Sequence, residues 1–337
     1  IYSPEKTIFR VWSPVKDEIF LNLYSNYNTY YRQVFTMYKS SDGVHEATIN
    51  WDLKGFFYTY LVDGVEVTDP YSLASSINST RSAIVDLKDT NPVGWESHTI
   101  PYNKRNCDAM VYEVHIKDFT ASPSSGAKNR GKYLGFVEKD TKYKDVKTGL
   151  SHLKELGISY IHIMPTNDFI SVREEKEIFL RDDNYNWGYD PELYNVPEGS
   201  YSMAPEDPVS RIRELKTMIM DLHEEGFKVI LDVVYNHTYK TLDSNFNIIM
   251  PNYYYRSNPD GSFSNGSGVG NEIASERPMV RKFIIDSLLY WVNEYKVDGF
   301  RFDLMALIDI DTVEEAIRIL RKKKPDIFIY GEPWTGG

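Results

Sequence analysis

The stretch VDGFRFDL (297–304), followed by a helical pattern and then by DIFIYGE (326–332), decides the fold of this chain. Each quoted segment is a short apolar run that ends in polar residues, which predicts a parallel β-strand buried on both faces. A strand, a crossover helix and a second parallel strand make a βαβ unit. The pattern therefore predicts an α/β sheet in which both strands end at the same edge.

Three more strands with following helices are predicted before this stretch, at AMVYEVHI (109–116), ISYIHIMP (158–165) and FKVILDVV (227–234). Five such strands fit either a doubly wound sheet or the first five strands of a (β/α)8 TIM barrel. No glycine-rich phosphate loop follows any of them, which removes the main support for a nucleotide-binding sheet. Polar residues gather at the strand ends, where barrel enzymes keep their active sites, so we predict the partial barrel.

The first hundred residues have a different pattern, in which short β-type runs are separated by Gly, Asp, Asn and Ser. This spacing predicts an all-β sandwich, and Asp63-Gly64 predicts one of its hairpin turns. We therefore predict a multidomain chain, with a β-sandwich at 1–98, a linker at 99–107 and the partial TIM barrel at 108–337. FRVWSP (9–14) and Asp69-Pro70-Tyr71 resemble the glycan-binding module that precedes the barrel in debranching and branching enzymes, which implies a glycan-binding-like module at 1–98.

Composition excludes several classes of function. The formal net charge of −11 argues against a nucleic-acid partner, because such proteins concentrate Lys and Arg. Cys107 is the only cysteine, so neither an intrachain disulfide nor a cysteine metal cluster is predicted. The apolar runs are too short for a membrane span, and no signal peptide is recognised in this chain, which leaves the compartment open.

Two carboxylates, Asp303 and Glu332, end the fourth and fifth predicted strands. Adjacent strands lie about 4.8 Å apart, and a retaining glycosidase holds its two carboxyl groups roughly 5 to 5.5 Å apart. Arg301 shares a face with Asp303 and is expected to keep it ionised, whereas Glu332, beside Trp334, is expected to stay protonated. The alternative is an ordinary ion pair and a solvated acid at a strand end.

The segment DVVYNH (232–237) places Asp232, Asn236 and His237 at the end of the third strand. A zinc site is not favoured, because no second His or Cys stands at metal-ligand spacing nearby. A donor to a sugar hydroxyl suits His237 better, and a hydrogen-bonded core histidine remains the alternative.

DVVYNH, GFRFDL and YGEPW resemble, in order and strand position, the first three motifs of the α-amylase superfamily of glycoside hydrolases. The resemblance implies that Asp303 is the nucleophile and Glu332 the general acid/base. It also implies that Arg301 and His237 contact the sugar at the cleavage point.

The segment YNWGYDP (185–191) is similar to the signature of type I pullulanases, and GKYLGF, YYYR and DGFRFDLM resemble the same family. The similarity covers nearly everything after Asp108 and implies that Tyr189 stacks on the sugar at the cleavage point. The further substrate-binding residues that we predict are Asp190, Asp232, Asn236, Met305 and Trp334.

The implied activity is retaining hydrolysis of α-1,6-glucosidic bonds in pullulan, amylopectin, glycogen and limit dextrins. No cofactor is expected to be required; calcium is compatible with the resemblance, although no loop has EF-hand spacing. The alternatives are a related isoamylase or branching enzyme and a non-catalytic α-glucan-binding fragment.

The family also has a fourth motif, a His-Asp pair after the seventh strand, whose aspartate is the third essential carboxylate. The printed sequence ends before that motif and before strands six to eight, so activity of this piece alone is not expected. Association through the open barrel edge is predicted instead, because unpaired strands accept partners. A bacterial protein of this kind could be cytoplasmic or secreted.

Overall fold

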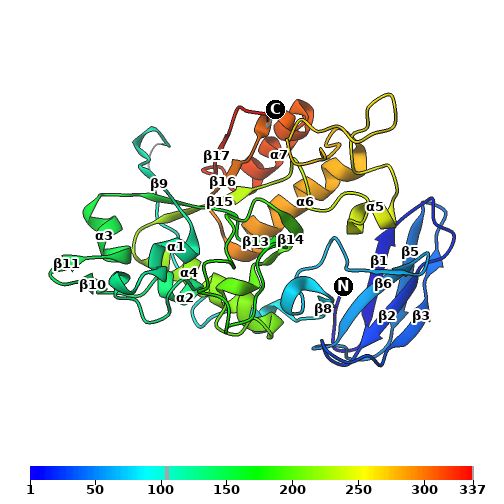
Figure 1. Ribbon diagram of the computed structural model, residues 1–337, viewed down its shortest axis with the longest axis horizontal. Coiled ribbons are helices and arrows are strands. Elements are labelled where there is room, and N and C mark those ends of the chain that lie inside the picture. The colour runs from blue at the N-terminus through cyan, green and yellow to red at the C-terminus, as the bar shows by residue number, and fades with distance from the viewer. Residues whose placement is uncertain (103–105, 336–337) are drawn as a thin grey trace.

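The computed structural model describes residues 1–102 and 106–335, and Figure 1 shows a β-structure joined to a larger α/β part. The predicted domain boundaries stay a prediction. Residues 103–105 of the predicted linker and the last two residues of the predicted barrel segment lie outside the described residues.

Two antiparallel sheets form the N-terminal part. One has the strand order β1-β5-β4, and the other has the order β3-β2-β6-β7, with β8 paired to β6. The ring of Phe9 on the first sheet packs against Tyr58 on the second, with centroids 4.9 Å apart, so the sheets share one core. Val62 pairs with Val65 across Asp63-Gly64, and both turn residues have positive φ, as the predicted hairpin requires. The strands are β1 (Thr7–Trp12), β2 (Phe20–Tyr24), β3 (Gln33–Thr36), β4 (Tyr38–Lys39), β5 (Val44–Ile49), β6 (Phe57–Val62), β7 (Val65–Val67) and β8 (Ser82–Ala83).

One five-stranded sheet, with the order β17-β16-β15-β12-β9, organises the rest of the described chain. Every neighbouring pair in it is parallel. The order follows the sequence without the reversal that defines a doubly wound sheet, so the predicted fold class, a β-sandwich followed by part of a barrel, is confirmed. The strands are β9 (Val111–Val114), β12 (Tyr160–Ile163), β15 (Lys228–Val233), β16 (Gly299–Phe302) and β17 (Phe328–Gly331).

Helices connect these strands, and capping residues, prolines and charged residues mark where the longer helices begin and end. Helix α4 (Pro208–Glu224) has proline at its start, and the side chain of Asp207 caps it by accepting a hydrogen bond from the amide of Val209. Helix α6 (Pro278–Tyr295) buries Trp291 and its apolar stripe, and α7 (Ile310–Lys323) ends in basic residues that suit the helix dipole. The shorter helices are α1 (Ile116–Ala121), α2 (Tyr133–Phe136), α3 (Gly149–Glu155) and α5 (Asn245–Ile249). The remaining strands are β10 (Lys142–Tyr143), β11 (Val146–Lys147), β13 (Asn167–Phe169) and β14 (Pro191–Pro197). No helix of the described chain has the length and apolarity needed to cross a bilayer.

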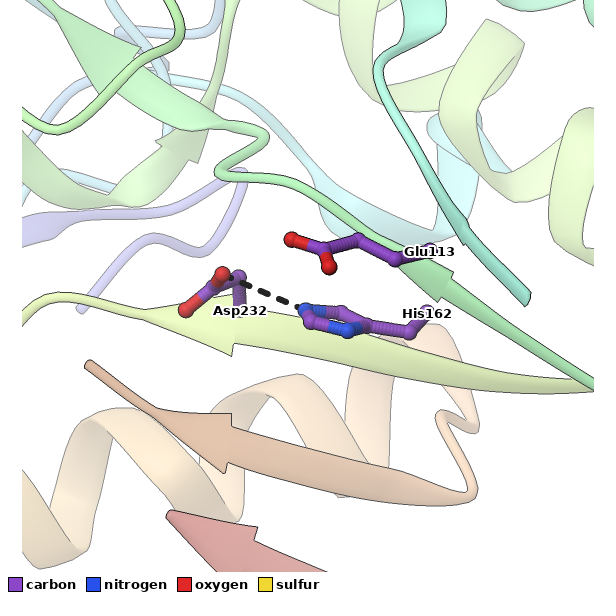
Figure 2. Close-up of side chains that lie close together, drawn as sticks. All are labelled: Glu113, His162 and Asp232. Carbon is purple, nitrogen blue, oxygen red and sulfur yellow. Dashed lines mark hydrogen bonds and ion pairs between the residues drawn. The ribbon is translucent and has the colours of Figure 1, made fainter. Parts of the chain in front are cut away.

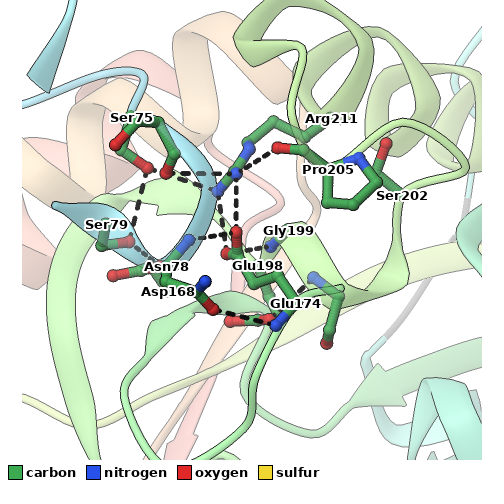
Figure 3. A network of polar contacts seen from close by, with 12 residues as sticks. Ser75, Asn78, Ser79, Asp168, Glu174, Glu198, Gly199, Ser202, Pro205 and Arg211 are labelled. Atoms are coloured by element: carbon green, nitrogen blue, oxygen red, sulfur yellow. Dashed lines mark hydrogen bonds and ion pairs between the residues drawn. The ribbon is translucent and has the colours of Figure 1, made fainter. Parts of the chain in front are cut away.

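A buried polar cluster joins the segment between β7 and β8 of the β-sandwich to the barrel part (Figure 3). Arg211 of α4 is completely buried and donates to both carboxylate oxygens of Glu174, at 3.1 and 3.0 Å. It also donates to Ser75 Oγ at 3.3 Å, while the amide of Asn78 donates to Glu174 at 2.7 Å. These bonds fasten residues 75–78 to the barrel part, since a buried donor or acceptor is costly to leave without a partner.

Candidate active site

The parallel register brings the predicted catalytic residues to one edge of the sheet. Asp232 of β15 pairs with Arg301 of β16, which in turn pairs with Tyr330 of β17. Asp303 directly follows β16, and Glu332 directly follows β17. Since side chains two residues apart on a strand share a face, all five point to the same side of the sheet.

Arg301 is the centre of the site. Its Nη1 donates to both carboxylate oxygens of Asp232, at 3.0 and 3.1 Å, and to Oδ1 of Asp303 at 2.9 Å. Its Nη2 lies 3.1 Å from Oε2 of Glu332. Burial by itself would lower the pKa of Arg301, but the charges of Asp232 and Asp303 raise it overall. One guanidinium therefore holds both predicted catalytic carboxylates together.

Burial sets the protonation of Asp303 more than its arginine partner does. Burial raises the pKa of Asp303 to about 6, although a hydrogen bond from Asn236 Nδ2, 2.9 Å long, and the charge of Arg301 lower it. The charge of Asp232 raises it further. Our expectation that Arg301 keeps this carboxylate ionised therefore holds at neutral pH but weakens on mild acidification.

Glu332 has a partly exposed side chain and is held in place by hydrogen bonds with backbone amides. Its Oε2 accepts from the amide of Leu304 at 3.3 Å, and its carbonyl accepts from the amide of Met305 at 2.8 Å. Met305 packs so closely on Gly331 that an added Cβ there would lie 2.0 Å from the methionine sulfur. The glycine thus lets Met305 sit beside Glu332, whose predicted role as proton donor stays a prediction.

Tyr189 contacts the carboxylate of Asp232, and His237 contacts the Tyr189 backbone and Asn236. The hydroxyl of Tyr189 donates to Asp232 Oδ2 at 2.8 Å. His237 is buried, which lowers its pKa, and its nitrogens face the Tyr189 carbonyl oxygen, at 2.8 Å, and Oδ1 of Asn236. Both nitrogens already have protein partners, and the predicted contacts of Tyr189 and His237 with a sugar stay predictions.

Two predicted binding residues lie outside this group of contacts. Asp190 is buried at the base of the loop and accepts a hydrogen bond from the amide of Ser171 at 3.0 Å. Trp334 follows β17 and is 65% exposed. Exposure leaves the indole of Trp334 accessible to a ligand. Asp190, which directly follows Tyr189, instead bonds to the backbone at Ser171 and so holds the segment that carries Tyr189.

Sequence reasoning missed three side chains near Asp232, which are Glu113, His162 and Tyr330. Figure 2 shows Glu113 and His162 beside Asp232. His162 Nε2 lies 3.2 Å from Asp232 Oδ2, and the hydroxyl of Tyr330 lies 2.9 Å from His162 Nδ1. The signal was present in the sequence: His162 interrupts the apolar run of ISYIHIMP, and Tyr330 stands two residues before Glu332.

Two groups of side chains in the described part of the chain have potential metal-ligand atoms within 4.8 Å of one another: Glu113, His162 and Asp232, and Asp168, Glu174 and Glu198. In the first, both histidine nitrogens are already bonded to protein side chains. In the second, Arg211 supplies the positive charge that faces Glu174. The expectation that no cofactor is required, with calcium only compatible with the resemblance, stays a prediction.

Comparisons with known proteins agree with these motifs, although no protein-family model matches the chain. The pullulanase of Bacillus subtilis strain 168 is 42% identical over 342 residues, covering 99% of this chain and 46% of the relative. The crystal structure of Paenibacillus barengoltzii pullulanase in complex with maltohexaose and α-cyclodextrin superposes with a TM-score of 0.94, at 44% identity, over 99% of this chain and 52% of that one.

The pullulanase structure from Bacillus acidopullulyticus gives a TM-score of 0.95 at 46% identity, and the match covers all of this chain and 42% of the other. The chain thus spans about half the length of the relatives that it matches. Sequence identity and backbone similarity extend through both the β-sandwich and the parallel sheet. The chain is therefore homologous to the pullulanases over nearly its whole length and corresponds to about half of theirs.

Proposed function

We propose that the protein containing this chain is a retaining glycoside hydrolase that cleaves α-1,6-glucosidic bonds in pullulan and branched α-glucans. The observation that carries the proposal is the single guanidinium of Arg301, which contacts both Asp303 and Glu332 at neighbouring strand ends. Similarity to pullulanases, including one whose structure holds maltohexaose and α-cyclodextrin, supports the choice of an α-glucan substrate.

In this mechanism Glu332 protonates the glycosidic oxygen while Asp303 attacks the anomeric carbon from the opposite face. The bond to the leaving sugar breaks, and a covalent glycosyl–Asp303 intermediate forms. Glu332, now ionised, removes a proton from water, which attacks the same carbon and frees Asp303. Asn236 and Arg301 orient the nucleophile through the bonds described above.

The reaction needs no organic cofactor in this proposal, because side chains supply both the nucleophile and the acid/base. In the described chain, β9 and β17 each pair with a strand on one side only, so both ends of the sheet have a free edge. We propose that further strands associate there, since closing a barrel requires pairing at both edges.

The test is hydrolysis of pullulan by the protein at its full natural length, followed through new reducing ends and through release of maltotriose. We expect wild-type turnover and a loss of at least about 10⁴-fold in Asp303→Asn, because the nucleophile is removed. Asp311→Asn, on the exposed start of α7, is the matched control and should keep wild-type activity.

The alternative functions give different results in the same assay. Transfer of glucan chains into new α-1,6 branches, without reducing ends, would identify a branching enzyme. Turnover of branched glucans but not of pullulan would favour an isoamylase type. Binding of pullulan with no turnover by any form would contradict hydrolysis and leave a glucan-binding protein.

A further inference from the structure

We propose that His162 and Tyr330 are positioning residues, which hold the Asp232 carboxylate so that Arg301 stays available to Asp303 and Glu332. The inference deepens the proposed function and rests on it. Tyr330 is the first residue of the YGEPW motif, whereas His162 lies outside every motif that carries the resemblance. Within the described residues, neither side chain forms a hydrogen bond with Asp303 or Glu332.

The direction of each hydrogen bond follows from the chemistry of the groups. Burial raises the pKa of Tyr330, so its hydroxyl keeps its proton and donates to His162 Nδ1, 2.9 Å away. A neutral imidazole that accepts at Nδ1 carries its proton on Nε2. That Nε2–H then donates to Asp232 Oδ2 at 3.2 Å. Tyr330 thus selects the tautomer of His162 that can hold Asp232.

Asp232 is the link between this chain of bonds and the catalytic carboxylates. Its side chain is fully buried, and its Oδ2 accepts from His162, from the hydroxyl of Tyr189 and from Arg301. Without the His162 donor, the buried Oδ2 of Asp232 loses one of its three hydrogen-bond partners. The remaining donors must then compensate for the lost hydrogen bond. The nearest compensating cation is Arg301, which would be drawn away from Asp303.

The groups facing His162 come from four neighbouring elements. Glu113 belongs to β9, which neighbours the His162 strand on one side, and Asp232 of β15, Arg301 of β16 and Tyr330 of β17 belong to the strands on the other side. His162 itself is 4% exposed in a strand whose other residues are aromatic or aliphatic. If the position served packing alone, an apolar side chain of similar size would replace it without effect on catalysis.

Three variants of the full-length protein separate positioning from packing. His162→Leu keeps the approximate volume but removes the donor, His162→Gln can place an amide N–H near the lost Nε2–H, and Tyr330→Phe removes the hydroxyl that fixes the tautomer. The readouts are kcat and KM on pullulan, the pH dependence of kcat/KM, and the thermal midpoint as a check of folding.

We expect His162→Leu to lower kcat about 10- to 100-fold, as is typical when a group that orients a reacting centre loses its partner, with little change in KM. The acid limb of the pH profile should move to higher pH, because a weaker contact with Arg301 raises the pKa of Asp303. His162→Gln should recover most of the lost activity, and Tyr330→Phe should fall between Leu and wild type.

An active wild type with an unchanged kcat and acid limb in folded His162→Leu would overturn the inference while leaving the proposed function intact. The same holds if Gln is as impaired as Leu, since the donor would then not matter. If His162→Leu does not fold, Tyr330→Phe decides: wild-type kcat and pH profile in that variant overturn the inference. An inactive wild type overturns the proposed function and this inference with it.

Discussion

Among the residues that the structure describes, two clusters each combine one arginine with three acids, and the two differ in exposure to solvent. The side chain of Arg301 is 13% exposed, whereas that of Arg211 is 0% exposed. The acids around Arg301 are Asp232, Asp303 and Glu332, and those around Arg211 are Asp168, Glu174 and Glu198.

Backbone amides fill the buried cluster. Glu174 accepts from the amides of Asn78 and Gly199, and Glu198 accepts from those of Phe169 and Ser200. Every carboxylate oxygen of Glu174 and Glu198 thus has a protein partner, and Arg211 holds chain segments together.

Protons balance the remaining charge there, because burial raises the pKa of Asp168 to about 8 and that of Glu198 well above its ordinary value. In the Arg301 cluster, by contrast, the side chain of Glu332 is 26% exposed, and burial raises the pKa of Asp303 only to about 6. The same set of charges therefore gives structure where the side chains are buried and can give chemistry where they are partly exposed to solvent.

Removing the buried arginine should produce the largest effect. We expect Arg211→Met to lower the free energy of unfolding by about 3 to 5 kcal/mol, because an uncompensated acid stays buried. Urea denaturation measures the change. The control is Arg213→Met, two residues further along α4 on its exposed face, whose free energy of unfolding should stay within about 0.5 kcal/mol of wild type. A loss below about 1 kcal/mol for Arg211→Met would mean that protons alone balance this cluster.

Removing the accessible arginine should act mainly on catalysis. Arg301→Met should reduce kcat/KM on pullulan by at least about 100-fold, since a preorganised donor to both carboxylates is lost. Arg318→Met, on the exposed face of α7, is the matched control in initial-rate assays. If Arg301→Met lost stability as Arg211→Met does while keeping its activity, the contrast between the clusters would be wrong.

The titration of Asp303 sharpens the comparison. As pH falls through about 6, this carboxylate gains a proton and can no longer attack, so kcat/KM should fall to half near that pH. Asn236→Ala removes a hydrogen bond that lowers the pKa of Asp303, and the acid limb should therefore move upward. A wild-type acid limb near pH 4, measured from pH–rate profiles, would contradict burial as the main influence.

The smallest effect, taken per unit of pH, concerns the buried acid Asp168. Its pKa is raised in the folded protein, so the folded state holds a proton that the unfolded state releases above about pH 4. Stability is therefore greatest below that pH and declines as pH rises through about 8, by at most about 1.4 kcal/mol per pH unit for one group. Asp168→Asn should flatten this slope in urea midpoints measured from pH 5 to 9, and an equal slope in both forms would refute it.

Much of the site followed from local patterns. The apolar strands, their order and the ends at Asp303 and Glu332 were predictable, because a parallel sheet places successive strand ends at one edge. The two acids could be predicted to be neighbours because each directly follows its strand. His162 was visible as a polar break in an apolar strand, but its partner could not be named, since Tyr330 lies 168 residues away.

The sequence by itself determined the fold class, the position of the two predicted catalytic acids and the resemblance to pullulanases, since each depends on short-range periodicity and motif order. Only the tertiary structure decided how charge is shared. Arg301 could have served Asp303 alone, yet it also binds Asp232 and Glu332. Burial and long-range contacts set those partners and the protonation of the acids, because both depend on which groups exclude water around them.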